Sequence, residues 1–391
     1  MASARPDDGW PRRASRVLGI GIEPFGRDDH GEPLVAERCE GACLVTTDGR
    51  RFVDWLMGFG SALLGYRHPE VEDAIEEQLG RGALMSLPHR LEVEVAERLV
   101  AMIPCATKVA FGKNGSDVTT AAVRVARAVT GRDGVLTCGY HGFHDWFAAS
   151  NATAQGIPAP LRSLVHPVPY DDLPTLRAVL AEHGSRIAAL VMEPTRTALP
   201  SPGYLAGVRA LTREYGVVLV FDEMVTGFRL ARGGAQQHFG VTPDLACVGK
   251  ALSNGLPLAA LVGPAEWIDV VPRVAYGMTA RGEPLAFAAA RATLAVHARI
   301  DVADHVRRIG EALRDGFTAL AVRHGVDARL GGPAAILTLV APEPFRERFL
   351  AGCRARLVLT NGHLLPSLAH GEAELEATLA VFDVAMRAAT S

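Results

Sequence analysis

Short apolar runs alternate with amphipathic helical patterns through the middle of this chain, and this alternation constrains the fold more than any other feature of the sequence. Six runs have the length and composition of buried strands: Lys108–Phe111, Val135–Cys138, Ile187–Met192, Val217–Phe221, Leu245–Val248 and Leu258–Val262. Helical patterns lie between several of them, at Asp117–Val129, Leu173–His183 and Gly207–Tyr215. We expect Ser116 to cap the first of these helices. Strands that alternate with helices predict an α/β fold with a mostly parallel sheet.

The patterns on either side of this region differ from it and predict two further parts. Residues 1–57 contain short strand-like runs and are expected to form an N-terminal segment. Beyond residue 284 an Ala-rich helical stretch leads into helices and short strands. We therefore expect a large domain over residues 58–284 and a smaller α+β domain over residues 285–391.

The balance of charges argues against nucleic acid or an anionic membrane as a partner. The 391 residues include 40 Lys and Arg and 43 Asp and Glu, which gives a formal net charge of −3. Such a chain lacks the basic surface that binds phosphate backbones or acidic lipids. The apolar runs are too short to span a bilayer, and the first residues lack the apolar stretch of a signal peptide. We therefore expect a cytoplasmic protein that binds neither nucleic acid nor membranes.

The six cysteines form neither a disulfide framework nor a zinc pattern. None of them belongs to a CxxC pair, and the chain contains no HExxH motif. Scattered cysteines of this kind favour free thiols in a reducing compartment. The sequence therefore predicts no metal site.

Polar or glycine-rich segments follow five of the six predicted strands. The segments are GKNGSD, GYHG, Glu193-Pro194, Asp222-Glu223 and Gly249-Lys250. Ligands bind at the carboxyl ends of the strands in open α/β sheets, so we expect these segments to meet at one site.

Lys250 is the residue of this set with the clearest chemical use. Only three of the 40 basic residues are lysines, namely Lys108, Lys113 and Lys250. A lysine at the end of a buried strand is desolvated, which lowers the pKa of its amine. The neutral amine is then available to form an imine with an aldehyde. The alternative is an ordinary surface lysine in a loop.

Asp222 ends the most apolar strand of the chain, VVLVFD. A carboxylate in that position is costly unless it has a cationic partner. A pyridinium nitrogen is such a partner, and a protonated ring nitrogen makes the ring an electron sink. A metal ligand or a helix cap would be other uses of Asp222.

Two further strand-end segments fit a flat, phosphorylated ligand. Asn114, Gly115 and Ser116 form a turn before a predicted helix, where backbone N–H groups and the positive helix end favour an anion. Tyr140 offers an aromatic face for stacking on a heterocycle, and the alternative is an ordinary core tyrosine.

Together these segments resemble class III aminotransferases, and most closely the branch that contains glutamate-1-semialdehyde aminomutase. The resemblance rests on FGKNGSDVTTAAVRVARAVTGRDGV, GYHGFHDW, VMEPTR, VVLVFDEMVTGFRL, PDLACVGKALSNGLPLAALVG and TARGEP. It implies a three-layer, fold type I transferase domain with a smaller α+β domain. It also implies an enzyme that uses pyridoxal 5′-phosphate (PLP), with Lys250 as its Schiff-base lysine and Asp222 paired with the ring nitrogen.

The resemblance further assigns the remaining cofactor contacts. These are Asn114, Gly115 and Ser116 at the phosphate, Tyr140 on one ring face with His141 beside it, Met224 on the other face, Glu193 in support, and Thr279. In the family, the threonine that matches Thr279 reaches the phosphate from the partner subunit. The resemblance therefore implies a homodimer with shared active sites.

The chain departs from the family where substrate is recognised. The aminomutase tryptophan corresponds to Phe59, with Ser61 nearby, and an expected Glu or Asn is Ala198, with Arg196 close in sequence. Phe59, Ser61 and Arg196 are therefore candidate substrate residues. We predict an aminotransferase that moves an amino group from a small-molecule donor to a small polar keto or aldehyde acceptor. The alternatives are a glutamate-1-semialdehyde-type aminomutase or other PLP-dependent isomerase, and a PLP-binding protein without catalysis.

Overall fold

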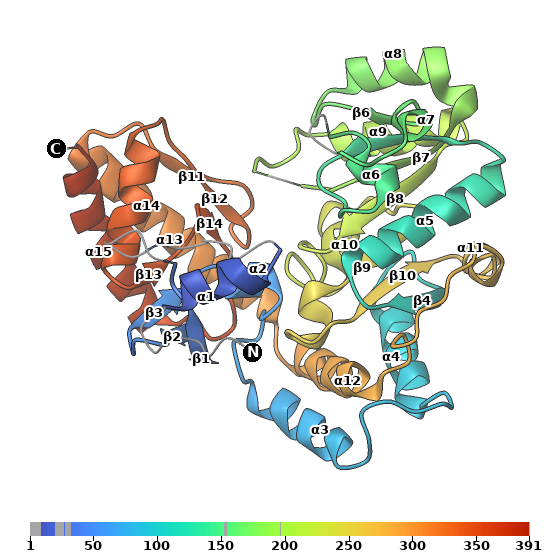
Figure 1. Ribbon diagram of the computed structural model, residues 1–391. Helices are drawn as coiled ribbons and strands as arrows, with labels where there is room; N and C mark the ends of the chain where they lie inside the picture. The colour runs from blue at the N-terminus through green and yellow to red at the C-terminus, as the bar shows by residue number, and fades with distance from the viewer. Residues whose placement is uncertain (1–8, 20–26, 28–32, 152–154, 196, 391) are drawn as a thin grey trace. The chain divides into compact units, whose positions relative to one another are not determined.

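The computed structural model describes residues 9–19, 27, 33–151, 155–195 and 197–390. The chain divides into two compact units (Figure 1). The sheet unit comprises residues 58–64 and 68–305, and the terminal unit comprises residues up to 57, 65–67 and 306 onward.

A seven-stranded sheet forms the centre of the sheet unit. Its strand order is β4 (Lys108–Gly112), β10 (Ala259–Gly263), β9 (Leu245–Val248), β8 (Val218–Glu223), β7 (Ile187–Met192), β5 (Gly134–Cys138) and β6 (Val165–Pro167). All neighbouring pairs are parallel except those that involve β10, which runs antiparallel to both β4 and β9. The predicted mostly parallel α/β fold is confirmed. The central strands are buried along their whole length, which explains why they appear in the sequence as continuous apolar runs.

Helices cover this sheet and extend from its edges. The longer ones are α3 (Pro69–Leu79), α4 (Arg90–Met102), α5 (Gly115–Thr130), α8 (Leu173–His183), α9 (Tyr204–Glu214), α10 (Gly234–Phe239) and α12 (Pro284–Arg299). Helix α5 packs on β7, β9 and β10 through a face of small and β-branched residues that includes Val118, Ala122 and Val125. Shorter helices of the sheet unit are α6 (Asp145–Ala148), α7 (Ala159–Arg162) and α11 (Ala265–Ile268). Helix α1 (Trp10–Val17) belongs to the terminal unit, and the single turn α2 (Met57–Gly60) lies where the chain passes from the terminal unit to the sheet unit.

The start of α5 differs from the sequence prediction. Its N-cap is Asn114, not Ser116: the Asn114 side chain accepts from the backbone N–H of Asp117, and the Asp117 carboxylate accepts from the N–H of Asn114 in return. This reciprocal arrangement satisfies two backbone donors, one of them in the first turn of the helix. Because the cap lies two residues earlier than predicted, Gly115 and Ser116 belong to the first turn of α5.

Over its described residues, the terminal unit contains two small sheets and three long helices. One sheet has the order β1 (Ala36–Glu40), β2 (Cys43–Thr46), β3 (Arg51–Asp54) and β13 (Val358–Leu359), and the other β11 (Arg329–Gly331), β12 (Leu337–Val340) and β14 (His363–Leu364). The helices are α13 (Val302–His324), α14 (Phe345–Ala355) and α15 (Glu372–Thr390). Phe317, Phe349 and Phe382 lie at the centre of its core.

The pairing of β13 with β3 joins the two ends of the chain. The predicted N-terminal segment and C-terminal domain therefore lie in one unit, and the division along the chain falls at residue 306 instead of 285. The partner of a short strand is set by contacts far away in sequence, which composition does not reveal.

In the described part of the chain, no helix has the length and apolarity needed to cross a membrane.

Candidate active site

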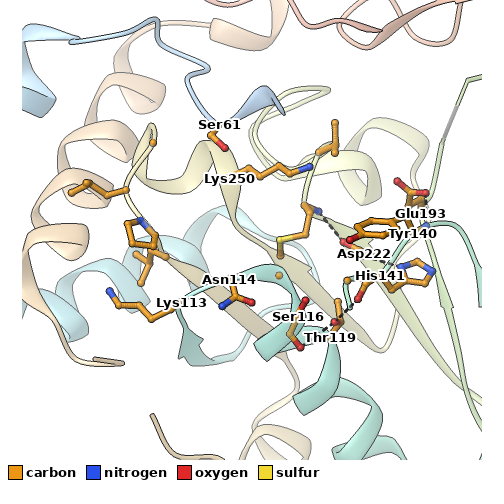
Figure 2. Close-up of a pocket in the computed structure, with 18 residues that line it drawn as sticks. Ser61, Lys113, Asn114, Ser116, Thr119, Tyr140, His141, Glu193, Asp222 and Lys250 are labelled. Carbon is orange, nitrogen blue, oxygen red and sulfur yellow. Dashed lines mark hydrogen bonds and ion pairs between the residues drawn. The ribbon is translucent and has the colours of Figure 1, made fainter. Parts of the chain in front are cut away.

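A pocket of about 400 Å³ opens at the carboxyl edge of the parallel strands, and all of its lining residues belong to the sheet unit (Figure 2). The lining comprises Ser61, Lys113, Asn114, Gly115, Ser116, Thr119, Tyr140, His141, Gly142, Glu193, Asp222, Met224, Val225, Lys250, Gly255, Leu256, Pro257 and Leu258. The segments that follow β4, β5, β7, β8 and β9 thus meet at one place, as the strand-end pattern predicts.

A buried acid and a buried imidazole form one end of the pocket. Nδ1 of His141 lies 2.8 Å from Oδ2 of Asp222, and both side chains are almost completely buried. The other carboxylate oxygen, Oδ1, accepts from the backbone N–H of Met224 at 3.1 Å. Two polar contacts therefore fix the orientation of the Asp222 carboxylate.

Lys250 differs from the other two lysines in its surroundings. Lys108 pairs with Asp269, and Lys113 pairs with Glu283 at 2.9 Å. Lys250 follows β9, next to the strand that carries Asp222, and lines the pocket (Figure 2). Burial lowers the pKa of its amine below the ordinary value, while the carboxylates of Asp222 and Glu193 act in the opposite direction. Its amine is therefore the one whose environment favours the neutral, nucleophilic form.

The first turn of α5 forms a second wall of the pocket. Gly115 and Ser116 place backbone N–H groups there, where the helix dipole favours an anion. Ser116 Oγ accepts from the N–H of Phe143 at 3.3 Å. Gly142 lies against this hydroxyl with φ +102°, and a Cβ at Gly142 would be 2.2 Å from Ser116 Oγ. Only glycine fits at this close approach.

Glu193 and Met224 complete the pocket around the segment that carries Tyr140. Glu193 Oε2 accepts from the backbone N–H of Tyr140 at 3.0 Å. The sulfur of Met224 lies beside Gly115 and Gly249, on the side of the first turn of α5. The pocket thus combines an amine, a buried carboxylate, an anion-binding helix end and an aromatic side chain.

Comparisons of sequence and of structure with known proteins indicate the same family. A sequence model of the family "Aminotransferase class-III" matches residues 25–347. Glutamate-1-semialdehyde 2,1-aminomutase of Thermomicrobium roseum is 36% identical over 409 residues, which covers 94% of this chain and 92% of that protein. The FumI protein of Sphingopyxis sp. MTA144, solved in its PLP internal aldimine form, is 30% identical with a TM-score of 0.91 and covers 96% of this chain and 94% of its own. An omega-transaminase from Sphaerobacter thermophilus is 25% identical with a TM-score of 0.91 and covers 99% of both chains.

This chain belongs to the class III aminotransferase family. It is a PLP-dependent enzyme that acts on small molecules, which confirms the predicted enzyme class and cofactor. The chemistry of the pocket fits this cofactor. A carboxylate suits a protonated ring nitrogen, backbone N–H groups at a helix end suit a phosphate, and a desolvated amine suits an aldehyde.

Among the residues that the structure describes, two that the sequence singles out do not line this pocket. Phe59 and Thr279 are exposed, and both lie outside the lining of the pocket as the described residues form it. Arg196 lies outside the described residues. Of the two predicted substrate residues that the structure describes in this class III enzyme, Ser61 lines the pocket and Phe59 does not.

Several lining residues were not predicted from the sequence. Thr119 lies in α5 three residues after the predicted contact Ser116, and Gly142 directly follows Tyr140 and His141, so both belong to motifs that were already recognised. Residues 255–258 precede β10 and reach the pocket because β10 runs antiparallel, which places its amino end at the carboxyl edge of its neighbours. The signal was the SNGLPLAALVG motif of the family, which the strand-end rule does not include.

Proposed function

We propose that this class III enzyme is an aminotransferase that moves an amino group from a small amino donor to a small polar keto or aldehyde acceptor. The observation that carries this proposal is the desolvated amine of Lys250 in one pocket with the buried His141–Asp222 pair and the first turn of α5. When bound, PLP supplies an aldehyde that exchanges amines and a ring that withdraws electrons from the α-carbon of the substrate.

In this proposal each side chain of the pocket has one task. Lys250 holds the cofactor aldehyde covalently and, once displaced by the substrate amine, moves a proton at the substrate α-carbon. Asp222 holds a proton on the ring nitrogen, and His141 fixes the carboxylate that does so. Gly115 and Ser116, preceded by Asn114, hold the phosphate through the N-terminal turn of α5.

The remaining cofactor contacts set the position of the ring. Tyr140 covers one face and Met224 the other, and Glu193 fixes the backbone of Tyr140 by accepting from its N–H group. The acidic charge of Glu193 also offsets part of the effect of burial on the Lys250 amine.

The lining of the pocket supports a polar substrate. The Ser61 hydroxyl and the Lys113 ammonium group are polar contacts that line this space. Phe59 and Arg196 remain candidate substrate residues from the sequence alone.

We also propose that the enzyme is a homodimer in which Thr279 completes the site of the partner subunit. Thr279 is exposed and is not among the described residues that line the pocket of its own chain. Several large apolar residues are exposed near the start of α4, among them Leu84, Leu87 and Val93. Exposed apolar groups of this kind are typical of a surface that another chain covers.

A second candidate function is an aminomutase, in which the amino group returns to the same carbon skeleton. It is favoured by the glutamate-1-semialdehyde 2,1-aminomutase of Thermomicrobium roseum, at 36% identity over nearly the whole chain. The cofactor contacts of the pocket serve both reactions equally, since the two reactions differ in whether a keto product leaves the site.

One experiment separates the two. Enzyme loaded with PLP receives each of a panel of amino compounds without any acceptor, and the released keto compound is counted per active site. An aminotransferase releases one equivalent from a donor and then stops, because the cofactor stays aminated. An aminomutase, loaded with the aminated cofactor, converts its substrate completely without net release. A wild-type enzyme that binds PLP and does neither with any compound would contradict both functions.

A further inference from the structure

Three hydroxyl groups in the first turns of α5 bind successive points of the loop after β5. Ser116 Oγ accepts from the N–H of Phe143, and Thr119 Oγ1 donates to the carbonyl oxygen of His141 at 3.0 Å. Thr120 Oγ1 is hydrogen-bonded to Nδ1 of His144 at 2.8 Å and accepts from Nε1 of Trp146 at 2.9 Å. The helix at the proposed phosphate site and the loop at the proposed ring site are therefore held together by side chains of α5.

The bond from Thr119 is the one that leads to the centre of the pocket. Thr119 is 1% exposed, and its bond holds the backbone of His141, whose side chain contacts Asp222 (Figure 2). The carbonyl oxygen of Ser116 also lies 3.4 Å from the same hydroxyl. A hydroxyl donates only one proton, and the shorter distance to the His141 carbonyl makes that the stronger hydrogen bond. A displacement of the His141 backbone would move its ring relative to the carboxylate.

We propose that Thr119 is a positioning residue that acts on the cofactor ring nitrogen through His141 and Asp222. This inference rests on the proposed function, because it assigns the Asp222 carboxylate to the ring nitrogen. Removal of the hydroxyl leaves the buried carbonyl of His141 without this donor, and the backbone of His141 relaxes toward another one. The carboxylate then loses part of its fixed orientation, and the ring nitrogen binds a weaker partner.

The test compares Thr119→Val, which keeps the shape of the side chain, with Thr119→Ser, which keeps the hydroxyl. Thr130→Val is the matched control, since Thr130 donates to the carbonyl of Ala126 at the far end of the same helix. The Kd for PLP is measured by equilibrium dialysis of each apoenzyme. We expect Thr119→Val to raise this Kd and to lower kcat about tenfold each, with KM unchanged, as for the loss of one buried hydrogen bond. Thr119→Ser and Thr130→Val are expected to match the wild type.

Two further arms test the route through His141. In the His141→Asn background, Thr119→Val should add no further loss, because the group through which it acts is already gone. With the PLP analogue that carries C–H in place of the ring nitrogen, wild type and Thr119→Val should bind equally well. Circular dichroism verifies folding, and Thr119→Ala replaces Thr119→Val if the latter does not fold.

The possible failures are distinguishable. Equal Kd values for wild type and Thr119→Val, or additive losses in the double variant, would overturn the role of Thr119 while the proposed function stands. If His141→Asn or Asp222→Ala instead has the same Kd for PLP as the wild type, the assignment of the ring nitrogen to Asp222 is contradicted.

Discussion

Lys250 and its immediate neighbours show how strongly single side chains are controlled by their surroundings. The amine lies among groups that act in opposite directions: burial favours its neutral form, and two carboxylates favour its charged form. Lys108, in contrast, is half exposed and pairs with Asp269 on the surface. One lysine therefore has a buried amine with a lowered pKa, and the other forms an exposed ion pair, although both lie at strand ends of the same sheet.

The first prediction follows from this contrast. Lys250→Ala removes the proposed base and covalent anchor, and we expect kcat to fall roughly 1,000-fold or more. Lys108→Ala is the matched control, because an exposed ion pair contributes little and no reacting group is lost. Steady-state kinetics with a productive donor and acceptor pair measures both variants. Comparable activity in Lys250→Ala and Lys108→Ala would contradict the role of Lys250.

A second prediction concerns His297, which is 1% exposed in α12. Burial, with help from the positive charges of Arg232 and Arg229, lowers the pKa of its imidazole to about 4 from the ordinary 6.5. Above pH 6.5 the ring is neutral in both the folded and the unfolded state, so it has no effect on stability. Between pH 6.5 and 4 only the unfolded state gains the proton, and stability falls by about 3 kcal/mol.

The measurement is urea unfolding of the wild type and His297→Gln between pH 7.5 and 4. We expect the difference in the free energy of unfolding between the two proteins to shift by about 3 kcal/mol over this range, in favour of the variant at low pH. The exposed His363 provides the control, His363→Gln, which should follow the wild type. A constant difference between wild type and His297→Gln would show that His297 does not cause the acid sensitivity.

The individual residues of the site were partly predictable from sequence. Lys250 and Asp222 stand directly after apolar strands, so the strand-end rule places them at the edge of the sheet. Thr119 could not be found in this way. Its function depends on a bond to His141, which is 22 residues away and belongs to another element, and only the folded structure brings the two together.

At the scale of elements, α5 and the loop after β5 form one functional assembly. The helix contributes its N-terminal turn and its hydroxyl groups, and the loop contributes the aromatic and imidazole side chains. Gly142 lies at a close contact between them, next to Ser116 Oγ. The distance between α5 and the loop at this contact therefore determines whether the N-terminal turn of α5 and the loop side chains can both reach the pocket.

The third prediction tests that contact. Gly142→Ala would place a Cβ 2.2 Å from Ser116 Oγ and strain a backbone with φ +102°, so helix and loop must separate. We expect the Kd for PLP to rise about tenfold or more, measured on the apoenzyme. Gly131→Ala is the control at the other end of α5, where φ is +65° and no atom lies within 4 Å of the added Cβ. It should cost about 1 kcal/mol of stability and leave the Kd unchanged. An unchanged Kd in Gly142→Ala would show that the contact is not needed.

The elements themselves were more predictable than their directions and partners. The strands β7 and β9 and the helix α8 have the bounds expected from apolar periodicity, since burial on both faces leaves a clear pattern. The direction of β10 was not predictable, because a parallel and an antiparallel strand of the same burial have the same composition. The cap of α5 was misplaced by two residues, since Asn114 and Ser116 are both good N-cap residues and only the bonds to Asp117 decide between them.

At the scale of the whole molecule, the division into units follows the strand pairing and not the order of the chain. The terminal unit is assembled from both ends of the sequence through β3 and β13. Sequence composition described the two ends as different in character but gave no indication that they share a sheet. A pairing over some 300 residues depends on the folded path of everything between them.

The fourth prediction tests the proposed homodimer. Chains with Lys250→Ala and chains with Thr279→Ala are produced together, so that about half of the dimers are hybrids. If Thr279 serves the partner subunit, each hybrid contains one site with both defects and one intact site, and the mixture recovers about a quarter of wild-type activity. If Thr279 serves its own chain, no site is intact. Each variant alone is the control and should show little activity, and a mixture no more active than either would contradict the shared site.

The scarcity of lysine in this chain has a practical consequence. Lys113 is largely covered by its pair with Glu283, and Lys250 lines the pocket, whereas Lys108 is half exposed at the beginning of β4. The pocket lies beyond the other end of that strand. Attachment of the holoenzyme to a solid support through lysine-directed chemistry should therefore occur mainly at Lys108, at the end of β4 opposite to the pocket.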